Sequence, residues 1–150
     1  MFINFQSYDN DDNIWEDSST LLTQLIKTKC QDNKMNIKKV KMVRCTHKGK
    51  PAWAQNDAMM EAYIEGMDYG YRINDDTHFI TPGWTEAFIT TLSSFDPPNV
   101  GVVGPNHKGG NSAILTYDFI SKLHIEIFGY HYPKIFTDWY AGRLCIIFKT

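Results

Sequence analysis

Apolar residues occur along this chain in short runs between polar turns, and the spacing within each run predicts a strand or a helix. In residues 37–45, Val40 and Met42 alternate with lysines, which is the period of two typical of a strand. Residues 67–73 are rich in tyrosine and end at a polar turn. The segments that we expect to form strands are residues 2–5, 37–45, 67–73, 100–103 and 113–116.

Four other segments have apolar residues at helical spacing. The first begins at Ser18 or Ser19, either of which could cap a helix, and carries a stripe of leucine and isoleucine. The second begins at Pro51, because proline fits the first turn of a helix, and Gly66 is its expected stop. The remaining two cover residues 84–92 and a segment that begins at Asp118 or Ser121 and runs through Ile127.

Alternating strands and helices predict an α/β fold with a mainly parallel sheet flanked by helices. The 150 residues suit a single domain, and 43% hydrophobic with 21% charged residues is ordinary for a soluble globular protein. We see no signal peptide, and every apolar run is shorter than the ~18 to 20 residues that span a bilayer. The expectation is therefore a soluble protein without a membrane span, cytoplasmic rather than secreted.

The charge and the cysteine content argue against nucleic-acid binding, a disulfide framework and a zinc site. A formal charge of −2 argues against a broad nucleic-acid-binding surface. We interpret the local basic cluster of Lys38, Lys39, Lys41 and Arg44 as a solvated strand face. The three cysteines are widely spaced and odd in number, which favours neither a disulfide framework nor a zinc site and is typical of buried or incidental thiols in a reducing compartment.

The clearest candidate for chemistry is Asn74-Asp75-Asp76, which directly follows a predicted strand. Ligands of open α/β sheets collect outside the carboxyl ends of strands. Two adjacent carboxylates repel each other unless a cation or hydrogen-bond donors compensate them, and Mn²⁺ or Mg²⁺ prefers oxygen ligands of this kind. The alternative is an acidic turn that caps the next helix or faces water.

Three blocks of sequence have an order and spacing that point to a known family. They are AYIEGMDYGYRINDDT at residues 62–77, TPGW at 81–84 followed by FDPPNVGVVGP at 95–105, and HIEIFGYHYPKIFTDW at 124–139. Together they make residues 51–139 resemble a group of GT-A-type glycosyltransferase domains found in viruses, algae, fungi and other eukaryotes. The resemblance implies a Rossmann-like GT-A fold and a metal-dependent transferase. Such an enzyme moves a sugar from a nucleoside-diphosphate donor to a hydroxyl acceptor on a glycan or protein.

The resemblance also implies roles for particular residues. Asn74-Asp75-Asp76 is similar to the family's DxD-type motif, with Asp76 as main metal ligand and Asp75 and Asn74 near the ribose or the waters of the metal. Asn56 resembles a recurring helix asparagine near the nucleotide-sugar pocket. Asp138 lies where such domains carry acidic residues on the acceptor side, so it could act as general base or hold the donor sugar. A plain helix cap is the alternative for Asp138.

The chain departs from the family at both ends of the domain. Members of the family continue after the Asp-Trp pair with further acidic residues, whereas here Tyr140 and Ala141 follow, and few residues precede the first helix. We therefore expect a single domain, residues 1–150, that is incomplete at both ends. These departures motivate an alternative function, a non-catalytic GT-A-like domain that binds a nucleotide, a glycan or a protein partner. An exposed edge strand in such a domain could pair with a second copy.

Several aromatic residues are candidates for stacking on sugar rings or for packing in the core. Trp84 is expected to anchor the core. Tyr130, Tyr132 and Trp139 cluster near the expected acceptor side, where they could stack on a sugar face or pack in the core.

Overall fold

The computed structural model describes residues 2–9, 20–21, 23–28, 37–45, 47, 49–73, 77–106, 115, 117–135 and 144–148. For residues 2–9, 37–38 and 144–148 it describes the path of the backbone. All the statements that follow concern these residues.

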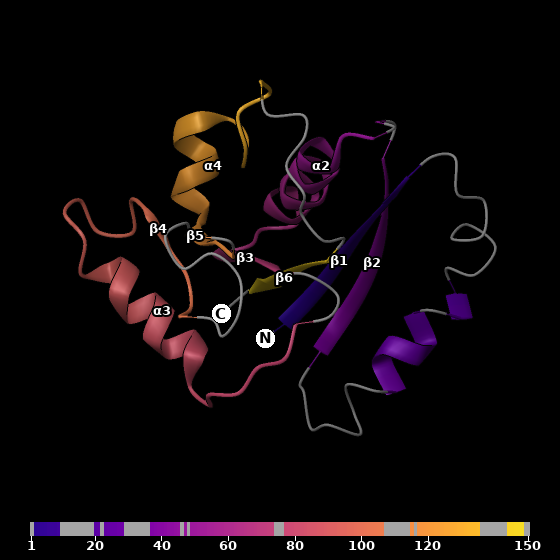
Figure 1. Ribbon diagram of the computed structural model, residues 1–150, viewed down its shortest axis with the longest axis horizontal. Coiled ribbons are helices and arrows are strands. Elements are labelled where there is room, and N and C mark those ends of the chain that lie inside the picture. Colours follow the sequence, from indigo (N-terminus) through magenta and orange to yellow (C-terminus); the bar gives the residue numbers. More distant parts are fainter. Residues whose placement is uncertain are drawn as a thin grey trace.

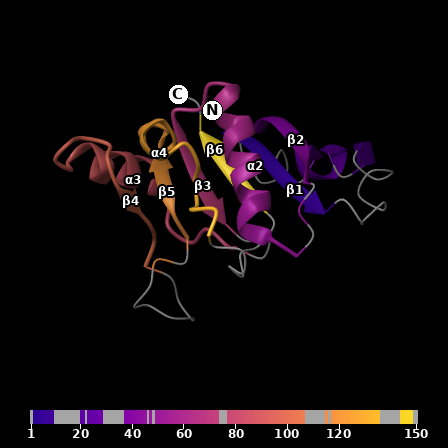
Figure 2. The same ribbon diagram turned by 90° about the horizontal axis from the view of Figure 1, so that it is seen from above.

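One mixed sheet of six strands organises the described chain, in the order β2-β1-β6-β3-β5-β4 (Figure 1). The strands are β1 (Phe2–Asp9), β2 (Ile37–Cys45), β3 (Tyr69–Ile73), β4 (Val102–Val103), β5 (Phe119–Ser121) and β6 (Leu144–Phe148). The helices are α2 (Pro51–Ile64), α3 (Trp84–Ser93) and α4 (Lys122–Phe128), and residues 20–21 and 23–28 are also helical. Figures 1 and 2 show α2 and α4 on one face of the sheet and α3 on the other.

The α/β class is confirmed, but the prediction of a mainly parallel sheet is wrong for the pairing of these strands. β1 pairs in parallel with β2, whereas β1–β6, β3–β6, β3–β5 and β4–β5 are antiparallel. The registers nevertheless leave β1, β2, β3 and β4 running in one direction. Helical crossovers return the chain so that successive strands point the same way, as the alternation predicted. The antiparallel pairing arises because β6 inserts between β1 and β3, and β5 between β3 and β4.

Most element boundaries follow the sequence pattern. β2, α2 and α3 lie where they were expected, and Pro51 is at the start of α2. The helix ends before Gly66, whose φ of 81° is in the left-handed region that glycine adopts without strain. Of the expected strand at 113–116, only Leu115 is described, and it has no regular structure.

The core has two parts because alternate residues of β3 point to opposite faces of the sheet. Gly70 lies against α2, where an added Cβ would come within 2.8 Å of the Met59 sulfur, so the missing side chain allows close packing. Tyr71 points to the other face, and its ring centroid lies 5.3 Å from that of Trp84 on α3. Trp84 is therefore a core anchor, as predicted.

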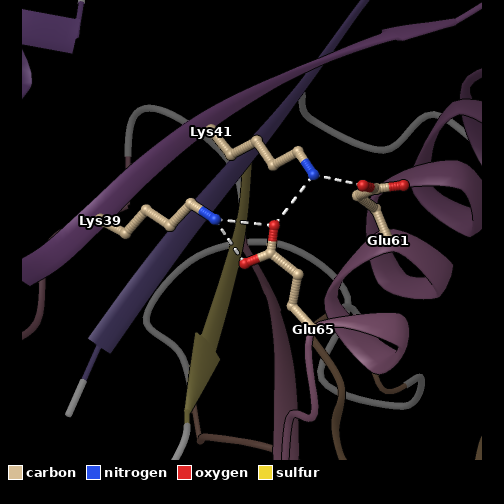
Figure 3. Close-up of polar contacts among 4 residues, drawn as sticks. All are labelled: Lys39, Lys41, Glu61 and Glu65. Carbon is tan, nitrogen blue, oxygen red and sulfur yellow. Dashed lines mark hydrogen bonds and ion pairs between the residues drawn. The ribbon is translucent and has the colours of Figure 1, made fainter.

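Charged side chains join β2 to α2 at the margin of the part of the core that lies between the sheet and α2 (Figure 3). Lys39 contacts Glu65 at 2.6 Å, and Lys41 contacts Glu65 at 2.9 Å and also pairs with Glu61. These contacts, through Lys39 and Lys41, lower the pKa of Glu65, while hydrogen bonds to Glu61 and Glu65 raise the pKa of Lys41. Lys39 and Lys41 remain in contact with solvent, as a solvated strand face requires, and they also pair with acidic residues on α2, which was not predicted. This four-residue group is called the marginal ion-pair network below.

No helix among the described residues is long and apolar enough to cross a bilayer.

Candidate functional site

The strand directions bring several strand ends to one edge of the sheet. β1, β2, β3 and β4 run the same way, so their carboxyl ends meet there, together with the amino ends of β5 and β6. β3 ends at Ile73, and Asn74, Asp75 and Asp76 follow it directly. These three residues, like Asp138, lie outside the described residues, so Asn56 alone of the predicted site residues can be placed.

A buried polar cluster lies at this edge, on the side of the sheet that carries α2 and α4. Arg72 of β3 donates a hydrogen bond from Nε to Oδ1 of Asp118 at 2.8 Å. The Tyr132 hydroxyl donates to the same oxygen at 2.6 Å, and Nε2 of His131 lies 2.6 Å from Oδ2. Arg72, Asp118 and His131 are 1%, 7% and 3% exposed, so these side chains interact almost without water between them. We refer to these four residues as the Asp118 cluster.

The surroundings keep Asp118 ionised. Burial alone raises the pKa of a carboxyl group, because a charge is less stable away from water. Here that effect is outweighed by the nearby His131 and Arg72 and by the hydrogen bond from Tyr132, and the pKa of Asp118 falls well below its usual range. At neutral pH the cluster therefore contains a buried carboxylate opposed by a buried guanidinium.

The segment that supplies His131 and Tyr132 is held on α2 by Asn56. The Asn56 side chain donates from Nδ2 to the Tyr132 carbonyl at 2.8 Å, and its Oδ1 accepts from the Tyr132 N–H at 2.7 Å. One turn earlier, Trp53 donates from Nε1 to the Lys134 carbonyl at 3.1 Å. Asn56 therefore uses both of its polar ends on the backbone. It is a positioning residue for Tyr132, and through Tyr132 for Asp118.

A cavity of about 350 Å³ adjoins the Asp118 cluster. Its lining residues are Val102, Leu115, Asp118, His124, His131, Tyr132 and Pro133. Nε2 of His131 faces the Asp118 carboxylate, whereas Nδ1 has no hydrogen-bond partner among the described residues. Nε2 of His124 is 2.9 Å from the His131 carbonyl, and burial lowers the pKa of His124. The cavity thus has apolar walls and one polar end.

The Asp118 cluster itself does not suit a metal ion. The carboxylate oxygens of Asp118 already face Arg72, Tyr132 and His131, and a guanidinium beside a cation would be repelled. Within the described part of the chain, no group of three or more His, Cys, Asp or Glu side chains could hold a metal. Cys45 is buried and forms no disulfide with any described residue, which agrees with the expectation for this cysteine.

The Asp118 cluster was not predicted from the sequence. Asp118 was expected only as a possible helix start, but Ser121 caps α4 and accepts a hydrogen bond from the Leu123 N–H. A signal was available in Arg72, because an arginine within a buried strand needs an acidic partner nearby. The sequence does not identify that partner, which is 46 residues away along the chain.

Comparison of the chain with family models, with curated proteins and with solved structures gives no match.

Proposed function

We propose that this chain is a GT-A-like glycosyltransferase domain that moves a sugar from a nucleoside diphosphate to a hydroxyl acceptor. The observation that carries the proposal is the position of β3. Its carboxyl end leads directly into Asn74-Asp75-Asp76, at the edge where four strands with the same direction end. Crevices outside the carboxyl ends of strands are the usual ligand sites of open α/β sheets.

The donor set of this segment fits a hard divalent cation. Asp75 and Asp76 offer carboxylate oxygens and Asn74 an amide oxygen, which are ligands that Mn²⁺ and Mg²⁺ accept. In this proposal Asp76 is the main ligand, and Asp75 and Asn74 hold the ribose or waters of the ion. When bound, the cation supplies positive charge that stabilises the departing diphosphate.

Contacts among the described residues fix the backbone on either side of the proposed site at this edge of the sheet. Arg72 lies two residues before Asn74, and its pairing with Asp118 anchors the end of β3 before the acidic segment. Asn56 and Trp53 hold Tyr132 and Lys134 on α2, and Asp138 follows four residues after Lys134. Asp138 is the proposed general base that accepts the proton of the acceptor hydroxyl. Asn56 is retained as a residue that shapes the nucleotide-sugar pocket by orienting its neighbours.

The test is calorimetric titration of UDP and GDP into the protein with and without Mn²⁺. We expect one nucleotide to bind only with Mn²⁺, and Asp76→Asn to weaken that binding at least about tenfold, a loss typical even of residues that only orient metal ligands.

Glu86→Gln is the matched control, because it also replaces one carboxylate by an amide, on the exposed surface of α3. It should bind nucleotide as the unaltered protein does. Equal nucleotide binding by Asp76→Asn and Glu86→Gln would contradict the proposed metal site. Nucleotide binding without sugar transfer or donor hydrolysis would favour the non-catalytic alternative.

A further inference from the structure

We propose that the cavity beside the Asp118 cluster binds a small, largely apolar molecule through a single hydroxyl group, as in a phenol. The cavity volume of about 350 Å³ is within the range of roughly 300 to 1,000 Å³ that is common for small-molecule sites. Val102, Leu115 and Pro133 give it apolar walls, and a ring or short hydrocarbon matches such walls better than a highly polar molecule does.

The polar end of the cavity is where the hydroxyl would be held. His131 is 3% exposed and lines the cavity, and its Nε2 faces Asp118 at 2.6 Å, yet its Nδ1 lacks a hydrogen bond among the described residues. Buried polar atoms are normally satisfied, so an unsatisfied imidazole in a cavity wall indicates a missing partner. A hydroxyl can either donate to Nδ1 or accept from it, and therefore fits this nitrogen with or without its proton.

The charges around the cavity favour a neutral ligand. An anion would be repelled by the Asp118 carboxylate, which lines the cavity and is ionised. A cation would meet a carboxylate that is already paired with Arg72 and in contact with His131. A neutral hydroxyl adds no charge to this cluster, and a hydrogen bond to His131 would offset the cost of burying it between apolar walls.

The position of the cavity suggests what the bound molecule would do. The cavity adjoins the sheet edge at which we propose the donor site, so the bound hydroxyl would be the sugar acceptor. That assignment as acceptor rests on the proposed function. The binding of a hydroxyl-bearing apolar molecule does not rest on it, and binding is what the following experiment measures.

The experiment compares p-cresol with toluene, which has the same ring and methyl group but no hydroxyl, by NMR titration of the full chain without nucleotide or metal. We expect p-cresol to bind about tenfold more tightly, as one additional well-placed hydrogen bond allows. His131→Phe keeps a ring but removes both nitrogens, and should abolish the preference while toluene still binds. Equal binding of the two probes to the unaltered protein, or an unchanged preference in His131→Phe, would overturn the proposal.

A second pair of variants tests the location without disturbing the Asp118 cluster. Leu115 lines the cavity with a side chain that is 44% exposed, so Leu115→Trp should fill the cavity and remove binding of both probes. Ile127→Trp is the control, since Ile127 is a similarly exposed residue of α4 that is not among the lining residues. Unchanged binding in Leu115→Trp would rule out this cavity.

The variants also separate the two proposals. Asp76→Asn should bind p-cresol normally, because it leaves the described lining residues Val102, Leu115 and His131 unchanged. Loss of cresol binding with intact metal-dependent UDP binding would reject the cavity proposal alone. Intact cresol binding without any nucleotide binding would reject the transferase proposal alone.

Discussion

The marginal ion-pair network and the Asp118 cluster are both made of opposite charges, but they differ in their access to water. In the network, the Lys39 side chain is 50% exposed and the paired glutamates remain partly solvated. In the cluster, Arg72 and Asp118 are almost completely enclosed. Water weakens the Coulomb attraction between exposed charges, and it also stabilises each charge when its partner is removed. Loss of a partner should therefore be tolerated in the network and damaging in the cluster.

The largest effect is expected from Asp118→Asn. It leaves the buried Arg72 guanidinium without its carboxylate, and breaking a buried pair in this way typically costs about 3 to 5 kcal/mol. Urea denaturation followed by circular dichroism gives the change in the free energy of unfolding. A loss below about 1 kcal/mol would show that the cluster is no more important than the network.

The contribution of Asp118 should also depend on pH. The folded-state pKa is depressed below the ordinary value of about 3.9, so the folded protein takes up this proton less readily than the unfolded chain. The stabilisation is therefore fully present above about pH 3.9 and is lost as the pH falls towards the folded-state pKa.

The measurement is the difference in unfolding free energy between the unaltered protein and Asp118→Asn, taken from pH 7 downwards. We expect a constant difference to about pH 4 and a decline below it. A difference that already declines between pH 7 and pH 5 would assign the pH dependence to another group.

The smallest effect is expected from Glu65→Gln in the network. This change weakens the contacts of Lys39 and Lys41, and exposed pairs of this kind typically contribute about 0.2 to 1 kcal/mol. The loss should shrink in 1 M salt, because the Debye length falls to about 3 Å. If Glu65→Gln proves as destabilising as Asp118→Asn, burial does not explain the difference between the two regions.

Elements formed by contacts between residues close in sequence were predicted well, and elements that depend on contacts between distant residues were not. α2 and α3 lie where helical spacing indicated, and Pro51 and Gly66 mark the limits of α2 through local backbone geometry. β5 and β6 were not predicted, although Leu144–Phe148 is a continuous apolar run. A short apolar run of this kind has no periodicity that separates strand from helix.

One part of the candidate site, the acidic segment, was predictable from the sequence, and the buried Asp118 cluster was not. The acidic segment at Asn74-Asp75-Asp76 follows a strand that the sequence pattern indicates, and the structure describes that strand up to Ile73. The roles of Asn74, Asp75, Asp76 and Asp138 remain predictions. The Asp118 cluster could not be derived, because Arg72, Asp118 and His131 belong to separate segments whose contacts depend on how β3 and β5 pair.

The sequence by itself determined the alternation of strands and helices, the common direction of β1 to β4, and a chain in which Arg72 needed a buried acidic partner. These properties depend on residue type and on spacing over a few positions. Only the tertiary structure decided that β6 lies between β1 and β3, that Asn56 holds the backbone of Tyr132, and that His131 lines a cavity with its Nδ1 unsatisfied among the described residues. The physical reason is that strand order and buried contacts join distant segments, and local patterns record the need for a partner but not which residue meets it.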